Sequence, residues 1–283
     1  MAVAGSIFAE RPRGDAILPG MIRAAGHIKC RFTANPRRTE ASELYEAGGY
    51  RMKFPKGPLC EGVLINTGGG MAGGDSITVD IALDKQAKAV VSTQSAEKIY
   101  KAQSEASTSS VHLSLAEGSQ LAWLPQETLL FSGAKLNRKF RVDMAVDATL
   151  TLFEGLIFGR GAMGERISDG TFRDSWRIKR GGKLVFADDV SIDGAMADRL
   201  DRPAVGNGAR AVATFLYLAP DAEARLDAAR LVLENSLCEC GASAWNGMLI
   251  ARFAAVDPSA LRQSATRFLN QFRAVSIPRV WQC

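Results

Sequence analysis

The fold is decided at the segment Ile65-Asn-Thr-Gly-Gly-Gly-Met-Ala-Gly-Gly-Asp75 and at residues 76–83, Ser-Ile-Thr-Val-Asp-Ile-Ala-Leu, which follow it. The question is whether the glycine loop leads from a strand into a helix or from a strand into another strand. Gly68, Gly70 and Gly73 have the G-x-G-x-x-G spacing that lets a main chain approach a dinucleotide pyrophosphate. Such a loop must open into a helix, because the N–H groups of the helix N-terminus hold the phosphate. The residues after Gly73 therefore decide whether the loop can bind a nucleotide.

Those residues have the period of a strand. Ile77, Val79, Ile81 and Leu83 recur at every second position, and the apolar run 63–65 before the loop also indicates a strand. The segment is thus predicted to be strand, glycine loop, strand, with glycines that permit a tight turn and close packing. A nucleotide-binding enzyme remains only as an unfavoured alternative.

The same alternation recurs from about residue 60 to 190. Short strands broken by Gly, Asp, Asn and Pro favour an antiparallel or coiled all-β body over βαβ units. The predicted strands are Lys88–Thr93, Val111–Leu115, Gln120–Leu124, Thr128–Phe131, Phe140–Val146, Thr149–Phe153, Phe172–Ile178 and Lys183–Phe186.

The last third of the chain contains helices. One is predicted from Pro220-Asp221 to about Asn235, with Leu226, Ala229, Leu233 and Leu237 on one face. A strand is expected over residues 247–253. Asp257 then caps a second helix with Pro258 at its first position, and its apolar stripe is Leu261, Ala265, Phe268, Leu269 and Phe272. We expect a single domain over 1–283, mainly β at about 28–218 and mixed β/α at about 219–283.

Composition narrows the class of protein. The 283 residues are 47% hydrophobic and 23% charged, which is typical of a globular chain. The net charge of +5 is spread along the sequence, so it suits an acidic partner but lacks the basic stripe and interleaved aromatics of nucleic-acid binding. A β-rich binding module for an acidic polymer or nucleic acid stays open as an alternative.

The chain is expected to be cytoplasmic. No apolar run approaches the ~18 residues of a membrane span, and the N-terminal 15 residues lack a basic start followed by an apolar core. Five widely spaced cysteines suit a reducing compartment. Cys238 and Cys240 have no second pair or nearby histidine, so ordinary thiols are favoured over a metal site.

No catalytic constellation is visible. The two histidines are His27, with no partner in view beyond Cys30, and His112, predicted at an exposed strand position. The Gly-x-Ser-x-Gly, His-Glu-x-x-His and Gly-Lys-Ser/Thr motifs are absent. Nothing in the sequence points to an enzyme.

Three other features have two interpretations each. Glu97 beside Lys98 is either a surface pair or part of a site, and Arg160 with Glu165 is either a turn salt bridge or part of a site. Trp281 either anchors the tail to the domain or binds a partner.

Taken in order, six segments resemble the urease accessory protein UreD family, also called UreH. They are Gly-Gly-Gly-x-x-Gly-Gly-Asp (68–75), Ala-Glu-Lys-Ile-Tyr-Lys (96–101), Leu-x-Trp-Leu-Pro-Gln-Glu (121–127), Gly-Arg-Gly-x-x-Gly-Glu (159–165), Gly-Met-Leu-Ile-Ala-Arg (247–252) and Pro-Arg-Val-Trp (278–281). The resemblance implies a non-enzymatic maturation factor with a mainly β, helix-like stack of strands. It also implies a complex with UreF, which recruits the GTPase UreG, and docking on apo-urease to deliver nickel.

The resemblance implies nickel in transit and no tightly bound cofactor. A divalent cation that must be released suits weak oxygen ligands, so we expect a water-filled passage lined by carboxylates. Asp75 and Glu165, in glycine-rich loops that match family motifs, are the candidate residues, with Glu97 as a third.

A second hypothesis concerns the contact with UreF. It assigns a share of that contact to the helix Ser259–Arg273 and to the tail Pro278–Trp281. The candidate partner-binding residues are Phe268, Phe272, Arg279 and Trp281.

Overall fold

The structure is a computed structural model that describes residues 23–161 and 164–282. The N-terminal stretch considered for a leader, Cys283 and two residues within the 159–165 motif lie outside the described residues.

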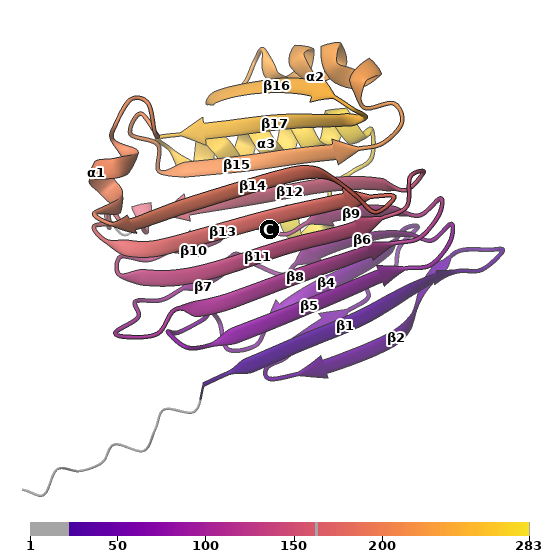
Figure 1. Cartoon of the computed structure of the whole chain (residues 1–283), viewed down its shortest axis with the longest axis horizontal. Helices are drawn as coiled ribbons and strands as arrows, with labels where there is room; N and C mark the ends of the chain where they lie inside the picture. Colours follow the sequence, from indigo (N-terminus) through magenta and orange to yellow (C-terminus); the bar gives the residue numbers. More distant parts are fainter. Residues whose placement is uncertain (1–22, 162–163, 283) are drawn as a thin grey trace, which may run out of the picture.

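The chain winds between two stacked β-sheets, in the manner of a β-solenoid (Figure 1). From β4 to β13 the longer strands alternate between the sheets, and each pairs in parallel with the strand of the previous turn. This confirms the mainly β, β-helix-like prediction, and of the two arrangements left open it is the coiled one.

One sheet has seven strands in the order β14 (Lys183–Gly194), β13 (Gly170–Arg180), β11 (Ala134–Met144), β8 (Ser107–Leu115), β5 (Ser76–Leu83), β1 (Ala25–Ala34) and β2 (Thr39–Ala47). The ten-stranded sheet has β16 (Glu239–Trp245), β17 (Met248–Ala255), β15 (Ala211–Leu218), β12 (Thr149–Phe158), β9 (Gln120–Leu124), β6 (Lys88–Thr93), β4 (Cys60–Asn66) and β3 (Tyr50–Lys53), with β10 (Thr128–Leu130) beside β12 and β7 (Glu97–Ile99) beside β10. The helices are α1 (Met196–Leu200), α2 (Leu226–Leu233) and α3 (Pro258–Arg273), with 3-10 turns η2 (Glu223–Arg225) and η3 (Arg279–Trp281).

Antiparallel strands close both ends of the seven-stranded sheet. β2 pairs antiparallel with β1, and β14 pairs antiparallel with β13. In the ten-stranded sheet, β3 closes one end on β4, and β15, β17 and β16 form an antiparallel set at the other. The parallel coil is therefore bounded by hairpin-like strands.

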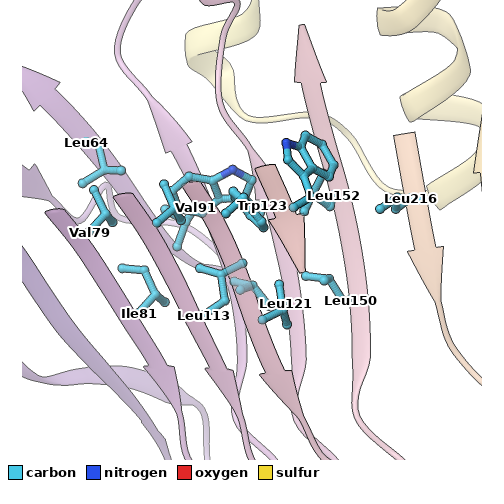
Figure 2. Close-up of a cluster of buried hydrophobic side chains, with 14 of the residues drawn as sticks. Leu64, Val79, Ile81, Val91, Leu113, Leu121, Trp123, Leu150, Leu152 and Leu216 are labelled. Atoms are coloured by element: carbon cyan, nitrogen blue, oxygen red, sulfur yellow. The ribbon is translucent and has the colours of Figure 1, made fainter. Parts of the chain in front are cut away.

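Period-two alternation builds the core between the sheets, because every second side chain points inward. Figure 2 shows part of this core, with Val79 and Ile81 of β5 and Leu113 of β8 among leucines and Trp123 of the other sheet. Full burial of such an aliphatic side chain stabilises the fold by about 1.5–3 kcal/mol. The inward positions of consecutive turns stack to give one continuous core.

A second core lies between the ten-stranded sheet and the helices α2 and α3. Phe268 of α3 packs edge-on against Phe215 of β15 and Phe253 of β17, with ring centroids 4.9 and 5.7 Å apart. The Asp257 side chain accepts a hydrogen bond from the Ser259 main-chain N–H at 3.0 Å, which confirms the predicted cap. The ten-stranded sheet runs through both the mainly β part and the mixed part of the chain.

The glycine loop joins β4 to β5, so the strand predicted after Gly73 is confirmed and no helix opens there. Gly70 has φ +152°, and a Cβ at this position would lie 2.8 Å from the Lys98 carbonyl oxygen. One helix prediction is corrected, since α2 ends at Leu233 and Leu237 is 64% exposed rather than on a buried face.

Candidate functional site

A cavity of about 100 Å³ lies between the two sheets, which is room for several water molecules. Its wall carries two carboxylates, Glu97 and Glu154, and one guanidinium, that of Arg138. Neutral polar residues also line it, namely Asn66, Thr93, Ser95, Ser109, Gln126 and Thr128. Apolar side chains make up the rest of the wall, and charged groups in such a cavity need a reason other than packing.

Glu97 turns into this cavity rather than forming a surface pair with Lys98. Its Oε1 accepts a hydrogen bond from Asn66 Nδ2 at 2.8 Å, and its Oε2 accepts one from the Tyr50 hydroxyl at 3.3 Å. Burial raises the pKa of Glu97, although these two donors oppose the shift. The strand β7 places the residue here by pairing with β10, so that Glu97 lies opposite Thr128.

A buried ionic cluster forms another part of the wall. Arg138 of β11 donates to Asp174 of β13 through Nε at 3.0 Å and through a terminal nitrogen at 2.5 Å. Its other terminal nitrogen donates to Glu154 of β12 at 2.6 Å. Glu154 also accepts from Trp123 Nε1 at 2.8 Å. Two carboxylates thus share one guanidinium, and all three side chains are 6–7% exposed.

Burial works against the charges of this cluster, and the ion pairs work in their favour. Burial raises the pKa of Glu154, while Arg138 and the Trp123 N–H act in the opposite direction. Burial also works against the charge on Arg138, but Asp174 and Glu154 outweigh it and hold the guanidinium pKa above its usual value. The cluster attracts a cation when Glu154 is ionised, because two carboxylates then outweigh one guanidinium.

A second hollow of about 740 Å³ lies on the other side of this cluster. The residues that line both hollows are Arg138 and Glu154. The second hollow adds carboxylates from both sheets, namely Asp174, Asp188, Asp189 and Glu239. The Arg138 and Glu154 side chains therefore line both hollows, each of which carries charged groups on a largely apolar wall.

Asp75 does not line either hollow. Its Oδ1 accepts a hydrogen bond from the Ala24 main-chain N–H at 2.9 Å, and its Oδ2 accepts one from the Ala72 N–H at 2.7 Å. The carboxylate therefore ties the glycine loop to the residues before β1. A metal role for Asp75 stays a prediction.

Glu165 likewise lies outside the two hollows. Its Oε1 accepts from the Ser132 N–H at 2.9 Å, and its Oε2 forms an ion pair with Arg160. The Ser132 hydrogen bond and the Arg160 charge lower the pKa of Glu165. The Arg160 guanidinium also lies 4.6 Å from the centre of the Phe131 ring. A turn salt bridge, one of the two interpretations above, is what the structure contains.

Three of the four candidate partner-binding residues lie in the second core. Phe268, Phe272 and Trp281 are 1%, 4% and 3% exposed. Trp281 Nε1 donates to the Leu124 carbonyl oxygen at 2.9 Å, so Trp281 anchors the tail. A partner would reach these side chains only by opening the core, whereas Arg279 is exposed. Their contact with UreF stays a prediction.

Metal-ligating residue types are dispersed. Among residues 23–161 and 164–282, no group of three or more His, Cys, Asp and Glu side chains is placed to hold a metal ion. Cys30, Cys60, Cys238 and Cys240 are free thiols, and burial raises the pKa of Cys238. His112 is exposed as predicted, and His27 has a partner that the sequence did not reveal, Asp80 at 2.7 Å.

The Arg138 cluster was not predicted from the sequence. A signal was present, because Arg138 and Asp174 occupy inward positions of alternating strands, between Leu136 and Phe140 and between Phe172 and Trp176. A charged residue at an apolar position of a strand indicates a buried ionic partner. Their partner, Glu154, stands within an apolar run.

The fold and the site together define a β-solenoid protein with a charged, hollow interior. The family model for the UreD urease accessory protein matches residues 24–282. The chain is 47% identical over 265 residues to "Urease accessory protein UreD" of Azorhizobium caulinodans, covering 93% of this chain and 98% of that protein. It is 46% identical over 282 residues to "Urease accessory protein UreD 1" of Methylobacterium radiotolerans, covering 97% of each. The chain belongs to the UreD urease accessory protein family.

Proposed function

We propose that this chain is a non-catalytic accessory protein in urease maturation, which passes nickel to apo-urease within a complex that also contains UreF and UreG. Its membership of the UreD family over almost the whole chain supports the role in maturation. The observation that supports nickel transit is the pair of carboxylate-bearing hollows that share Arg138 and Glu154. A cytoplasmic location belongs to the same proposal, and the four free thiols suit it.

The donor chemistry fits a cation in transit. Carboxylate, amide and hydroxyl oxygens line the first hollow, and such ligands hold a borderline divalent ion more weakly than imidazole or thiolate. Weak ligands allow release at the far end. Glu97 is the one of the three predicted metal residues that lies on this path.

The Arg138 cluster would control the passage. Its guanidinium repels a cation, while Glu154 and Asp174 attract one, so the cluster as a whole favours a divalent ion only if a carboxylate exchanges a hydrogen bond to Arg138 for a bond to the ion. Glu154 can make that exchange and keep its Trp123 hydrogen bond. The path would then run past Glu97 to Glu154 and on to Asp188 and Glu239.

The test is maturation of purified apo-urease with UreF, UreG, GTP, bicarbonate and nickel, in the presence of wild-type chain or Glu154→Gln. We expect Glu154→Gln to lower the nickel content and the activity of urease together, because it removes a carboxylate at the junction. Glu223→Gln, at an exposed position outside both hollows, is the matched control.

Each result has a distinct meaning. Equal nickel loading by wild type and Glu154→Gln, with both well folded, would refute transit through these hollows. Normal loading of urease without the chain would refute the maturation role itself.

A further inference from the structure

Within residues 23–161 and 164–282, no helix layer covers the outer face of the seven-stranded sheet. Figure 1 shows its strands in the foreground, from β14 to β2, while α3 lies behind the ten-stranded sheet. The helices α2 and α3 belong to the second core, on the outer face of that other sheet. The face is built of parallel strands in continuous register from β1 to β13, which makes it broad and regular.

Basic side chains concentrate on two neighbouring strands of this face. The outward residues of β11 are Lys135, Asn137, Lys139, Arg141 and Asp143, and those of β13 are Thr171, Arg173, Ser175, Arg177 and Lys179. Six of these ten are Lys or Arg and one is acidic. We call this surface the basic face.

This charge is only partly compensated within the chain. Arg177 pairs with Asp189 of β14 at 2.7 Å. The hydrogen bond from Thr171, helped by the charge of Arg173, lowers the pKa of Asp193. Among the residues that the structure describes, no ion pair within 4.0 Å engages Lys139, Arg141 or Arg173, and all three are exposed. Arg141 is also the register partner of Arg177, and like charges opposite each other on adjacent strands oppose folding.

A basic patch on a sheet whose charge is only partly compensated attracts an acidic partner. The ten outward residues include no aromatic side chain on which a base could stack, so single-stranded nucleic acid is not favoured. A flat array of extended strands matches the surface of a folded protein rather than a peptide, which needs a groove or a free strand edge. Charge complementarity then determines the orientation and rate of docking.

We propose that the basic face is the surface that docks on an acidic face of apo-urease. This inference rests on the proposed role in urease maturation, and it names which surface of the chain makes the contact. Lys139, Arg141 and Arg173 lie at its centre, and their charges attract the partner before contact.

The experiment compares two triple variants. Lys139→Gln, Arg141→Gln and Arg173→Gln together remove three charges from the basic face, whereas Lys53→Gln, Lys56→Gln and Arg202→Gln remove three exposed charges elsewhere. Both lower the formal net charge by three, so any effect of overall charge is shared. Binding to immobilised apo-urease is measured with UreF present, at about 0.05 M and about 0.5 M salt.

We expect the basic-face variant to bind about tenfold more weakly at low salt, mainly through slower association, and the control to bind like wild type. The difference should shrink at high salt. Equal binding by both variants would overturn the inference and leave the maturation role intact. No binding by wild type would overturn both. If the basic-face variant lost the binding to a DNA duplex that wild type shows, and bound apo-urease as wild type does, the face would be assigned to nucleic acid and the proposal overturned.

Discussion

The Arg138 cluster gives a stability prediction whose size follows from its geometry. Replacing Arg138 by Met keeps much of the side-chain volume and removes three hydrogen bonds to carboxylates, two to Asp174 and one to Glu154. Removing one partner of a buried ion pair costs about 3–5 kcal/mol, because the other charge stays buried. With an m-value of ~3 kcal/mol/M, the urea midpoint should fall by ~1 M or more.

The loss should depend on pH in a defined direction. Burial already raises the folded-state pKa of Glu154, and Arg138 is the largest influence that opposes that rise, ahead of the Trp123 N–H. In Arg138→Met the folded-state pKa rises further above the unfolded value, so the folded state binds more protons in that window. Stability of the variant should therefore increase as the pH falls from about 8 to about 5, more steeply than that of wild type.

Two further variants identify the cause. Adding Glu154→Gln to Arg138→Met should restore part of the stability, since it removes one uncompensated charge. Arg252→Met breaks the partly exposed pair with Asp188, in which Arg252 is 55% exposed, and should cost less than about 1 kcal/mol. Urea denaturation followed by tryptophan fluorescence measures all four proteins. A loss below about 1 kcal/mol in Arg138→Met, or one with no pH dependence, would refute the reasoning.

Two other substitutions test the placement of the candidate site residues. Trp281→Ala should lower the free energy of unfolding by about 3–5 kcal/mol, and Trp281→Phe by less, because Phe keeps the packing and loses the hydrogen bond to Leu124. Similar denaturation midpoints for Trp281→Ala and wild type would contradict the anchoring role. Asp75→Ala should cost about 1–3 kcal/mol, because it leaves two main-chain N–H groups without their acceptor, and hydrogen exchange at Ala24 and Ala72 should accelerate. Unchanged exchange at both amides would show that the carboxylate does not hold the loop.

Local patterns predicted much of the fold. Two strands, β6 and β9, have the bounds that the sequence predicts, Lys88–Thr93 and Gln120–Leu124. Alternation and the flanking turn residues mark both ends of these strands. Asp257 and Pro258 likewise predict the start of α3, because an N-cap residue followed by proline marks the first turn of a helix. The order of strands in each sheet was out of reach, since it depends on pairings between segments far apart in the sequence.

The site was harder to predict than the fold. The sequence does not show which of the charged neighbours Glu97 and Lys98 faces the interior. Only the pairing of β7 with β10 decides that Glu97 faces inward. Trp281 could equally have been a tail anchor or a binding residue, because an apolar side chain buries itself against whichever surface is available. Glu154 lies among apolar residues, and its partners are Arg138 from the opposite sheet and Trp123 from its own sheet.

The antiparallel strands at the ends of the seven-stranded sheet also affect whether the protein self-associates. In a parallel coil each turn is a template for the next, so an open terminal turn would recruit a second molecule edge to edge. Glu40 and Glu43 on β2, and Asp188, Asp189 and Asp193 on β14, place charge on both terminal strands. These charged antiparallel strands prevent edge-to-edge pairing, which could otherwise extend the sheets into a filament. Loss of β2 or β14 would therefore do more than lower the stability of the fold, because it would expose a parallel strand edge and make self-association depend on protein concentration.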